Sequence, residues 1–395
     1  MLGYKSIRIL GVMLFIFLWS CTLTYGVNNL HMGKLELNPF ISVEQKFDDN
    51  IFLERKNQED DDWITTTILG LGLKTPLISG REEDFTLKAK YDIDFIEFWD
   101  HTNQNRVDHN FLASADLKFT SDVNLKINDK FQKTADPPNS ELTALEKRIR
   151  NTSGVVLGYM REKIGLDLGY QNIRDDYSSL NSLDKYEHIS TTTGYFNFSP
   201  KTSLFGEYNF GKIIYDNNNT NSDSKYNQYR LGIKGRIAPK LTGLVKAGYK
   251  KTDYNDSSKK NFKGFTTFVN VTYDLKERTT LNLFGERGSE ESTYSTNNYF
   301  EYNKAGLKVD HELLDKLFLI TQGYYQLNKY PDETTESSVT DKREDKIWDG
   351  SIGLRYELKD WVNLETNYEY KKRDSKFNTY DYRDNKFTTK VNFLF

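Results

Sequence analysis

Cysteine, proline and long apolar runs are scarce in this sequence. Of 395 residues one is cysteine, Cys21, and seven are proline. A chain with a single thiol has no disulfide framework. The prolines stay out of the strand interiors predicted below, except for Pro39 near the start of the first strand. Beyond the N-terminal segment no stretch approaches the roughly 18 apolar residues of a membrane-spanning helix. Disulfide-stapled and helical membrane proteins are therefore excluded.

Apolar residues are also few, at 37% of the chain, against about 45 to 50% in globular domains. Charged residues reach 28% and aromatic residues 14%, led by 26 Tyr and 25 Phe. This balance is typical of a chain that turns one face to lipid and the other to water, because no thick protein core has to be filled. The net charge of −3 gives no indication of a nucleic-acid partner, and we expect none.

Residues 1–26 have the features of a signal peptide. Two basic residues open the segment, the apolar stretch 9–19 follows, and the tripeptide at 24–26 offers small residues at the −3 and −1 positions of a cleavage site. We predict export from a bacterial cytoplasm, with a short periplasmic segment over 27–36. Lipoprotein processing at Cys21 is the alternative, although the bulky tryptophan two residues earlier fits that motif badly.

Residues 37–395 repeat a pattern of long amphipathic strand, short turn, long amphipathic strand and long polar loop, with a period of about 40 residues. The count is about eighteen strands, an even number that puts both chain ends on the short-turn side. A β-propeller has a similar period, but its blades need four strands of about five residues. We therefore predict an all-β fold, a single antiparallel transmembrane β-barrel of the outer membrane with short periplasmic turns and long extracellular loops.

Polar and apolar residues alternate along the predicted strands. In segment 361–372, Leu364 and Tyr368 share one parity, and Glu365 and Glu369 the other. A Lys or Arg facing lipid at mid-bilayer would cost about 2 to 4 kcal/mol, so we predict that the charged parity lines the pore. The predicted pore-lining residues are Lys88, Lys90, Asp92, Asp94, Arg230, Lys234, Arg236, Lys246, Lys250, Asp349, Arg355, Glu357, Glu365 and Glu369. The basic residues near 230–250 and the two glutamates predict a transverse field.

The last nine residues, Phe387 to Phe395, form an amphipathic strand that ends on an aromatic residue. Such an edge is hazardous when exposed, and we expect it to pair with the first strand near residues 39–47. A final Phe preceded by alternating apolar residues resembles the signal that the barrel-assembly machinery reads. We predict that Val391, Phe393 and Phe395 form this signal, and that the assembly machinery and outer-membrane lipid are partners.

Motifs that carry chemistry are missing. The sequence contains no G-x-S-x-G, H-E-x-x-H, P-loop or dinucleotide fingerprint, so we predict no enzyme and no catalytic, cofactor-binding or metal residues. Acidic residues cluster at 48–49 and 59–62, where they would suit a divalent cation; a solvated loop is the simpler interpretation. The five histidines form no recognisable pairing with serine and aspartate, which makes a barrel-borne hydrolase the weakest alternative.

The chain resembles the β-barrel porin-2 family, which includes proteins associated with exopolysaccharide export. The resemblance rests on P-F-I-S-V-E-Q-K-F-D-D-N-I-F-L from Pro39 to Leu53, on the turns S-P-K-T at Ser199 and A-P-K-L at Ala238, and on the terminal strand. It covers nearly the whole chain in architecture, with motif-like detail only at 47–52. It implies an outer-membrane location and a place in surface-polysaccharide secretion, and it brings no catalytic residues.

We therefore expect a channel for polar solutes in the outer membrane, with exopolysaccharide as a candidate cargo. A barrel of this width leaves an aqueous lumen unless loops or a plug intrude. The loops that begin at Thr134 and Pro331 are long enough to fold inward as a constriction or to cover the outer rim. The alternative is a structural or surface-interaction barrel whose extracellular loops bind a partner.

Overall fold

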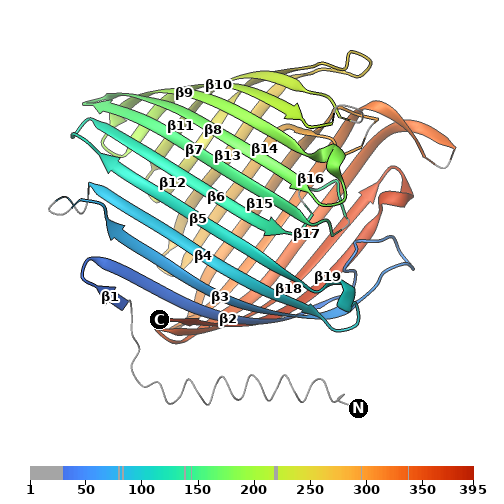
Figure 1. Ribbon diagram of the computed structural model, residues 1–395, viewed down its shortest axis with the longest axis horizontal. Helices are drawn as coiled ribbons and strands as arrows, with labels where there is room; N and C mark the ends of the chain where they lie inside the picture. The colour runs from blue at the N-terminus through green and yellow to red at the C-terminus, as the bar shows by residue number, and fades with distance from the viewer. Residues whose placement is uncertain are drawn as a thin grey trace.

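The structure is a computed structural model that describes residues 30–78, 81, 84–137, 139–143, 145–217, 221–294, 296–336 and 338–395. Within these ranges nineteen strands form one antiparallel sheet. The short strand β1 pairs with β2, and the long strands β2 to β19 follow one another around a ring that closes where β19 pairs with β2 (Figure 1). The prediction of a barrel with about eighteen strands is confirmed. The predicted signal peptide, residues 1–26, lies outside the described residues.

The elements have the following bounds. The strands are β1 Leu30–Met32, β2 Leu35–Asp48, β3 Asp62–Pro76, β4 Phe85–Phe98, β5 Arg106–Lys118, β6 Val123–Thr134, β7 Arg148–Arg161, β8 Ile164–Tyr177, β9 Lys185–Ser199, β10 Thr202–Tyr215, β11 Ser224–Ala238, β12 Leu241–Tyr254, β13 Phe262–Lys276, β14 Thr279–Glu291, β15 Tyr299–Leu314, β16 Leu317–Glu336, β17 Val339–Lys359, β18 Val362–Ser375 and β19 Tyr382–Leu394. Short 3-10 helices lie in the loops at η1 Thr102–Gln104, η2 Asn181–Leu183 and η3 Asn378–Tyr380.

The alternation of the sequence decides which face each strand turns outward. On β18 Leu364, Tyr368 and Tyr370 are exposed, and on β11 the same holds for Tyr229 and Leu231. Residues two apart on a strand share a face, so each strand presents a continuous apolar row to the outside. A closed sheet with such a surface has every backbone group paired within the ring and suits a lipid environment.

The connections at the two ends of the barrel differ as predicted. Tight turns join β7 to β8 and β11 to β12, where Glu162 and Lys240 take positive φ angles of 52° and 64°. Longer loops occupy the opposite end, and three of them contain the 3-10 helices η1, η2 and η3. Of the helices in the described ranges, none is long and apolar enough to cross a membrane.

Gly235, beside one of these turns, provides a test of the local geometry. Its φ is +103°, a conformation that residues with a side chain rarely adopt, and a Cβ there would collide with the carbonyl oxygen of Lys201. We expect Gly235→Ala to destabilise the barrel by about 1 to 3 kcal/mol, seen as a lower urea midpoint of unfolding in detergent. Gly194→Ala is the control, because a Cβ at Gly194 meets nothing within 4 Å. Equal midpoints for the two variants would contradict this account.

Backbone pairing of β19 with β2 closes the ring at its short-turn end. Phe393 lies opposite Ile41 in the register, and the N–H of Phe395 donates to the carbonyl oxygen of Pro39 at 2.9 Å. The last strand is therefore the partner of the first, as the sequence predicts. The two edges satisfy each other, and the sheet presents no free edge at this seam.

The Asp-Asp-Asn stretch that follows β2 fastens the other end of the same seam. Asp49 accepts hydrogen bonds from the backbone N–H and the Nδ2 of Asn385, at 2.6 and 2.7 Å. Asn50 is fully buried, and its Nδ2 donates to the carbonyl oxygen of Arg383 at 2.7 Å. The motif with the clearest family resemblance therefore has a structural role in closing the barrel.

One stretch differs from the prediction. The described residues of 331–344, predicted as a polar loop, instead extend β16 and β17 into a hairpin that projects past the rim (Figure 1). Pro331 is tolerated there because the register shifts between Lys329 and Glu333, a bulge at which no ladder hydrogen bond from its nitrogen is needed. The described part of the predicted N-terminal segment 27–36 forms β1 and the first residues of β2.

Candidate functional site

The loop between β6 and β7 crosses the interior of the barrel. Its described residues are 135–137, 139–143 and 145–147. Residues Ser140 and Glu141, which form its tip, contact the β14–β15 loop and the strands β16 and β18. In the ring β16 lies about half-way round from β7, so the tip reaches the opposite wall. Of the two loops predicted to be long enough to fold inward, the one after Thr134 does so.

Glu141 is fully buried at the centre of this contact. Its carboxylate accepts hydrogen bonds from the backbone N–H of Thr293 at 2.6 Å and from the hydroxyls of Ser292 and Thr293, both at 2.8 Å. Burial raises the pKa of the Glu141 carboxyl, while the Thr293 N–H, Arg343 and the two hydroxyls act in the opposite direction by stabilising its charge. If the loop tip left the wall completely, water could replace these hydrogen bonds. If it moved only part of the way, the buried carboxylate and its donors would lose their partners without gaining water.

Ser140 docks the same tip onto the far wall. Its Oγ accepts hydrogen bonds from Asn328 Nδ2 at 2.9 Å and from Gln326 Nε2 at 3.1 Å, both on β16. From β18, Arg373 Nη1 donates to the carbonyl oxygens of Ser140 and Glu141 at 3.0 and 3.2 Å. Asn328 and Arg373 are buried, so these hydrogen bonds are shielded from water and hold the backbone of the tip as well as its side chains.

A buried arginine in a cage of tyrosines supports this wall. Arg343 Nη2 is 2.7 Å from an Asp345 carboxylate oxygen. The Cζ of Arg343 lies 3.6 Å from the ring centroid of Tyr380, 4.8 Å from that of Tyr330 and 5.1 Å from that of Tyr294. Rings at these distances attract a guanidinium through their negative faces. These contacts hold Arg343 within the wall on which the loop docks.

The loop is also shaped by a turn at its tip and by contacts of its returning segment. Asn139 Oδ1 accepts the N–H groups of Glu141 and Leu142, at 2.9 and 3.2 Å, and so forms the turn at the tip. Glu146 Oε1 accepts the Ser179 N–H of the next long loop at 2.7 Å. Leu145 packs against a buried apolar cluster over β3 and β4. Local turn chemistry and one apolar anchor thus direct the chain into the lumen.

A polar cavity of about 180 Å³ lies beside the loop tip. Asn139 and Thr293 form its loop side. Its wall side carries both signs of charge, with Arg150, Lys185, Lys250, Asp175, Glu187, Glu290 and Glu291 among the lining residues. The hydroxyls of Tyr254 and Tyr226 each donate to one of these carboxylates at 2.9 Å, to Glu291 and Glu187 respectively. Such a surface can bind a polar solute through both donors and acceptors.

The predicted pore-lining residues share the inner face of the sheet. On β12, Lys246 and Lys250 have the parity of the cavity wall, and Arg230 lies opposite Gly248 in the register. Five candidates on β17 and β18 share the inward face of the sheet with Arg343, Asp345 and Arg373, because all of them are at odd-numbered positions. The five are Asp349, Arg355, Glu357, Glu365 and Glu369. On β4, Asp92 and Asp94 accept hydrogen bonds from Asn110, and Lys88 and Lys90 continue the row. Lys234 and Arg236 continue the β11 row toward the short turns.

The two charge clusters expected to create a transverse field each contain their own counter-charges. Glu207 on β10 forms ion pairs with both Arg230 and Lys246. Lys386 on β19 lies 4.0 Å from Glu369 and 2.6 Å from Asp384. Neighbouring strands therefore neutralise much of the segregation seen along the sequence. The sequence signal for these partners is weak, because cross-strand pairing depends on register.

The acidic cluster of the first loop is occupied by structural hydrogen bonds. Asp62 accepts N–H groups from Trp99, Asp100 and His101, at 2.8 to 3.2 Å. Asp49 closes the barrel seam. Over the described ranges, no three His, Cys, Asp or Glu side chains converge in a way that could hold a metal ion. The interpretation of this cluster as a cation site gains no support from its geometry.

The fold and the interior together define a porin-like barrel of the bacterial outer membrane: a closed antiparallel ring, an apolar exterior and a charged lumen spanned by a loop. The chain belongs to the family described as "Putative beta-barrel porin 2", whose model matches residues 25–395. This family is one of porins rather than of enzymes. No curated protein matches the sequence.

Solved structures share this fold. The outer membrane protein OpdK from Pseudomonas aeruginosa aligns with a TM-score of 0.50 and 11% identity over 91% of this chain and 99% of that chain. An improved structure of the same protein, under the name OccK1, aligns with a TM-score of 0.51 and 10% identity over 91% of this chain and 99% of that chain. OccK2 (OpdF) of P. aeruginosa aligns with a TM-score of 0.50 and 11% identity over 91% of this chain and 98% of that chain. At these identities the likeness concerns the fold.

Proposed function

We propose that this barrel is a channel for polar solutes in which the docked β6–β7 loop sets the narrowest passage. The observation that carries the proposal is the attachment of Ser140 and Glu141 to the wall opposite the loop's own root. A barrel of about eighteen strands is too wide for wall side chains to fill. In this proposal the loop held across it divides the lumen, and solutes pass through polar openings at its flanks.

The charged residues of the inner face supply the remaining selectivity in this proposal. Glu207, Arg230 and Lys246 form one mixed cluster on the wall, and Lys250 with Glu291 borders the cavity beside the loop. Mixed charge keeps the passage hydrated, and it favours solutes that carry both hydrogen-bond donors and acceptors over apolar ones. The fourteen residues predicted to line the pore have this role along the full height of the barrel.

The docked loop also bears on the cargo. A polymer such as exopolysaccharide, which the family resemblance suggests, would have to thread past the tip, so its passage requires release of Glu141 from Thr293. Small polar solutes need no such release. We therefore assign small polar solutes to the docked state, and we assign export of a polysaccharide strand to a state in which the loop has moved.

Reconstitution of the purified barrel in planar bilayers tests the channel. We expect discrete single-channel steps that scale with salt concentration, because the lumen is polar and hydrated. Heat-modifiable migration in electrophoresis would show that the reconstituted protein is folded. Folded protein that inserts but gives no steps would contradict the proposal and favour a structural or surface-interaction barrel.

A further inference from the structure

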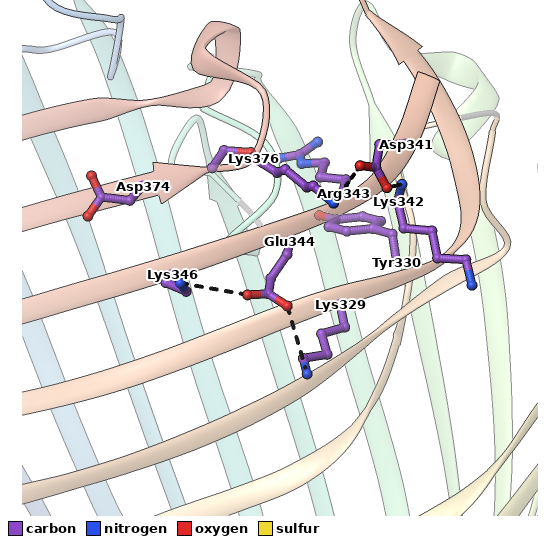
Figure 2. Close-up of a pocket in the computed structure, with 10 residues that line it drawn as sticks. Lys329, Tyr330, Asp341, Lys342, Arg343, Glu344, Lys346, Asp374 and Lys376 are labelled. Atoms are coloured by element: carbon purple, nitrogen blue, oxygen red, sulfur yellow. Dashed lines mark hydrogen bonds and ion pairs between the residues drawn. The ribbon is translucent and has the colours of Figure 1, made fainter. Parts of the chain in front are cut away.

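A recess of about 530 Å³ lies at the rim of the barrel that carries the long loops, between the last part of β16, the first part of β17 and the end of β18 (Figure 2). Its lining includes lysines and carboxylates from all three strands, among them Lys329, Lys346, Lys376, Glu344 and Asp374. Figure 2 shows Glu344 between Lys329 and Lys346, with dashed contacts to both. These lysines and carboxylates have no part in the loop-docking site, the polar cavity or the lumenal charge clusters described above.

The lysines stand on the lipid-facing side of the wall. Lys346 and Trp348 are two residues apart on β17 and so share a face, and Trp348 is half exposed on the outside of the barrel, at 50%. Trp348 packs on Tyr325 with 4.4 Å between ring centroids. Lys372 lies opposite Trp348 in the register of β17 with β18. The cationic cluster consists of Lys329 and Lys346 in the recess and Lys372 beside it. It begins where the outward aromatic pair of Trp348 and Tyr325 ends.

The lysines above the aromatic pair lie at the level of the lipid headgroups. Outward Trp and Tyr side chains of barrels sit at the interface between the hydrocarbon and the headgroups. In bacterial barrels the rim with the long loops is extracellular, so lysines just beyond the aromatic pair are level with the headgroups of the outer leaflet. Their aliphatic stems can lie along the apolar surface while the ammonium groups reach the polar layer.

The cations of this cluster are engaged only in solvent-exposed ion pairs. Glu344 is shared by two of them, with 3.8 Å from its oxygens to Lys329 Nζ and to Lys346 Nζ. Lys372 pairs with Asp374 at 2.7 Å, and both side chains are more than a third exposed. Exposed ion pairs contribute little to stability. These ammonium groups can therefore turn to a stronger anion at small cost.

We propose that this cluster binds a membrane lipid with a phosphorylated headgroup. The phosphate accepts hydrogen bonds from Lys329, Lys346 and Lys372, and the acyl chains lie against the aromatic pair below. Basic clusters beside a membrane surface attract anionic headgroups. The continuity of the cations with lipid-facing aromatic residues favours a lipid over an acidic protein partner, which would need a surface clear of the bilayer.

Lipid binding to the folded full-length barrel tests this assignment. The probe is an acylated disaccharide lipid that carries two phosphates, added to the protein in neutral detergent micelles and counted by native mass spectrometry. The variant combines Lys329→Gln, Lys346→Gln and Lys372→Gln. The control combines Lys163→Gln, Lys276→Gln and Lys359→Gln, which removes the same charge from exposed positions at the short-turn end.

We expect the first variant to bind the phosphorylated lipid at least about tenfold more weakly than the wild type. The control should stay close to the wild type, and the same lipid without phosphates should bind weakly to all three proteins. Equal losses in the two variants, or wild-type binding that is indifferent to the phosphates, would overturn the proposal. So would equally tight binding of the deacylated phosphorylated disaccharide, which would assign the recess to a soluble ligand, or capture of an acidic protein in place of lipid. Heat-modifiable migration of each variant verifies its folding.

Discussion

Replacing residues 137–145 with a short glycine-serine linker is expected to raise the single-channel conductance of the barrel severalfold. The conductance of a wide pore is limited by its narrowest cross-section, and the β6–β7 loop provides that section by attaching Ser140 and Glu141 to the opposite wall. Without the loop, the two flanking passages merge into one lumen of about eighteen-strand width. Planar-bilayer recordings under the same salt as the wild type measure the change.

A single substitution should distinguish the effect of the loop's docking on conductance from the effect of its presence. Glu141→Ala removes the acceptor of three hydrogen bonds from Ser292 and Thr293. We expect its channel to switch between the conductance of the wild type and that of the loop deletion, because Ser140 and the main chain of the tip still engage Asn328 and Arg373. Glu141→Gln keeps an acceptor of similar shape and should switch less often.

The hairpin of β16 and β17 supplies the matched control for the deletion. Shortening it across residues 334–340 removes extracellular structure of comparable size but leaves Arg343 and the loop-docking residues in place. Its conductance should equal that of the wild type. A deletion of the β6–β7 loop that leaves conductance unchanged, or a shortened hairpin that raises it as much, would show that the constriction lies elsewhere.

Truncation of Val391 to Phe395 is expected to abolish assembly of the barrel. These residues pair with residues 39–43 across the closing seam. Their loss would leave backbone groups of β2 and β18 without partners in the hydrocarbon layer, at a cost of several kcal/mol for each unsatisfied group. Loss of the heat-modifiable folded band, both in membranes and after refolding in detergent, is the expected result.

A milder variant distinguishes closure of the sheet from recognition of the terminus. Phe395→Ala keeps the backbone that donates to Pro39, so it should refold in detergent like the wild type. If the assembly machinery reads the terminal aromatic residue, the same variant should accumulate unfolded in cells.

A chain that starts at Lys34 lacks β1, which pairs with β2 outside the ring, and should refold normally. Folded, heat-modifiable protein from the chain that lacks Val391 to Phe395 would refute the role of the last strand.

The strands were predictable because their signal is local. A period of two between apolar and polar residues predicts both the existence of a strand and its buried face, and the predicted segment 361–372 corresponds to β18, Val362–Ser375. The closing pair of β19 with β2 followed from the need to remove two edges. The parity of the charged lumenal residues followed from the same alternation.

The site was only partly predictable because its contacts are not local. The docking of the β6–β7 loop depends on Ser292, Asn328 and Arg373, which are more than 150 residues from the tip in the chain. No periodicity links them. The hairpin after Lys329 was missed because Pro331 and its polar neighbours are typical of a loop, whereas a bulge in the register accommodates them within a strand.

The distance along the chain between the loop and its docking residues also sets an order of events. The tip at Ser140 and its partner Arg373 on β18 are 233 residues apart in the chain, and contacts of such separation are slow to form because chain closure must come first. We therefore expect the ring to be nearly complete before the loop has all of its docking partners. We expect the inserting barrel to have an undivided lumen at first, and the loop to complete its docking once β16 and β18 stand in the opposite wall.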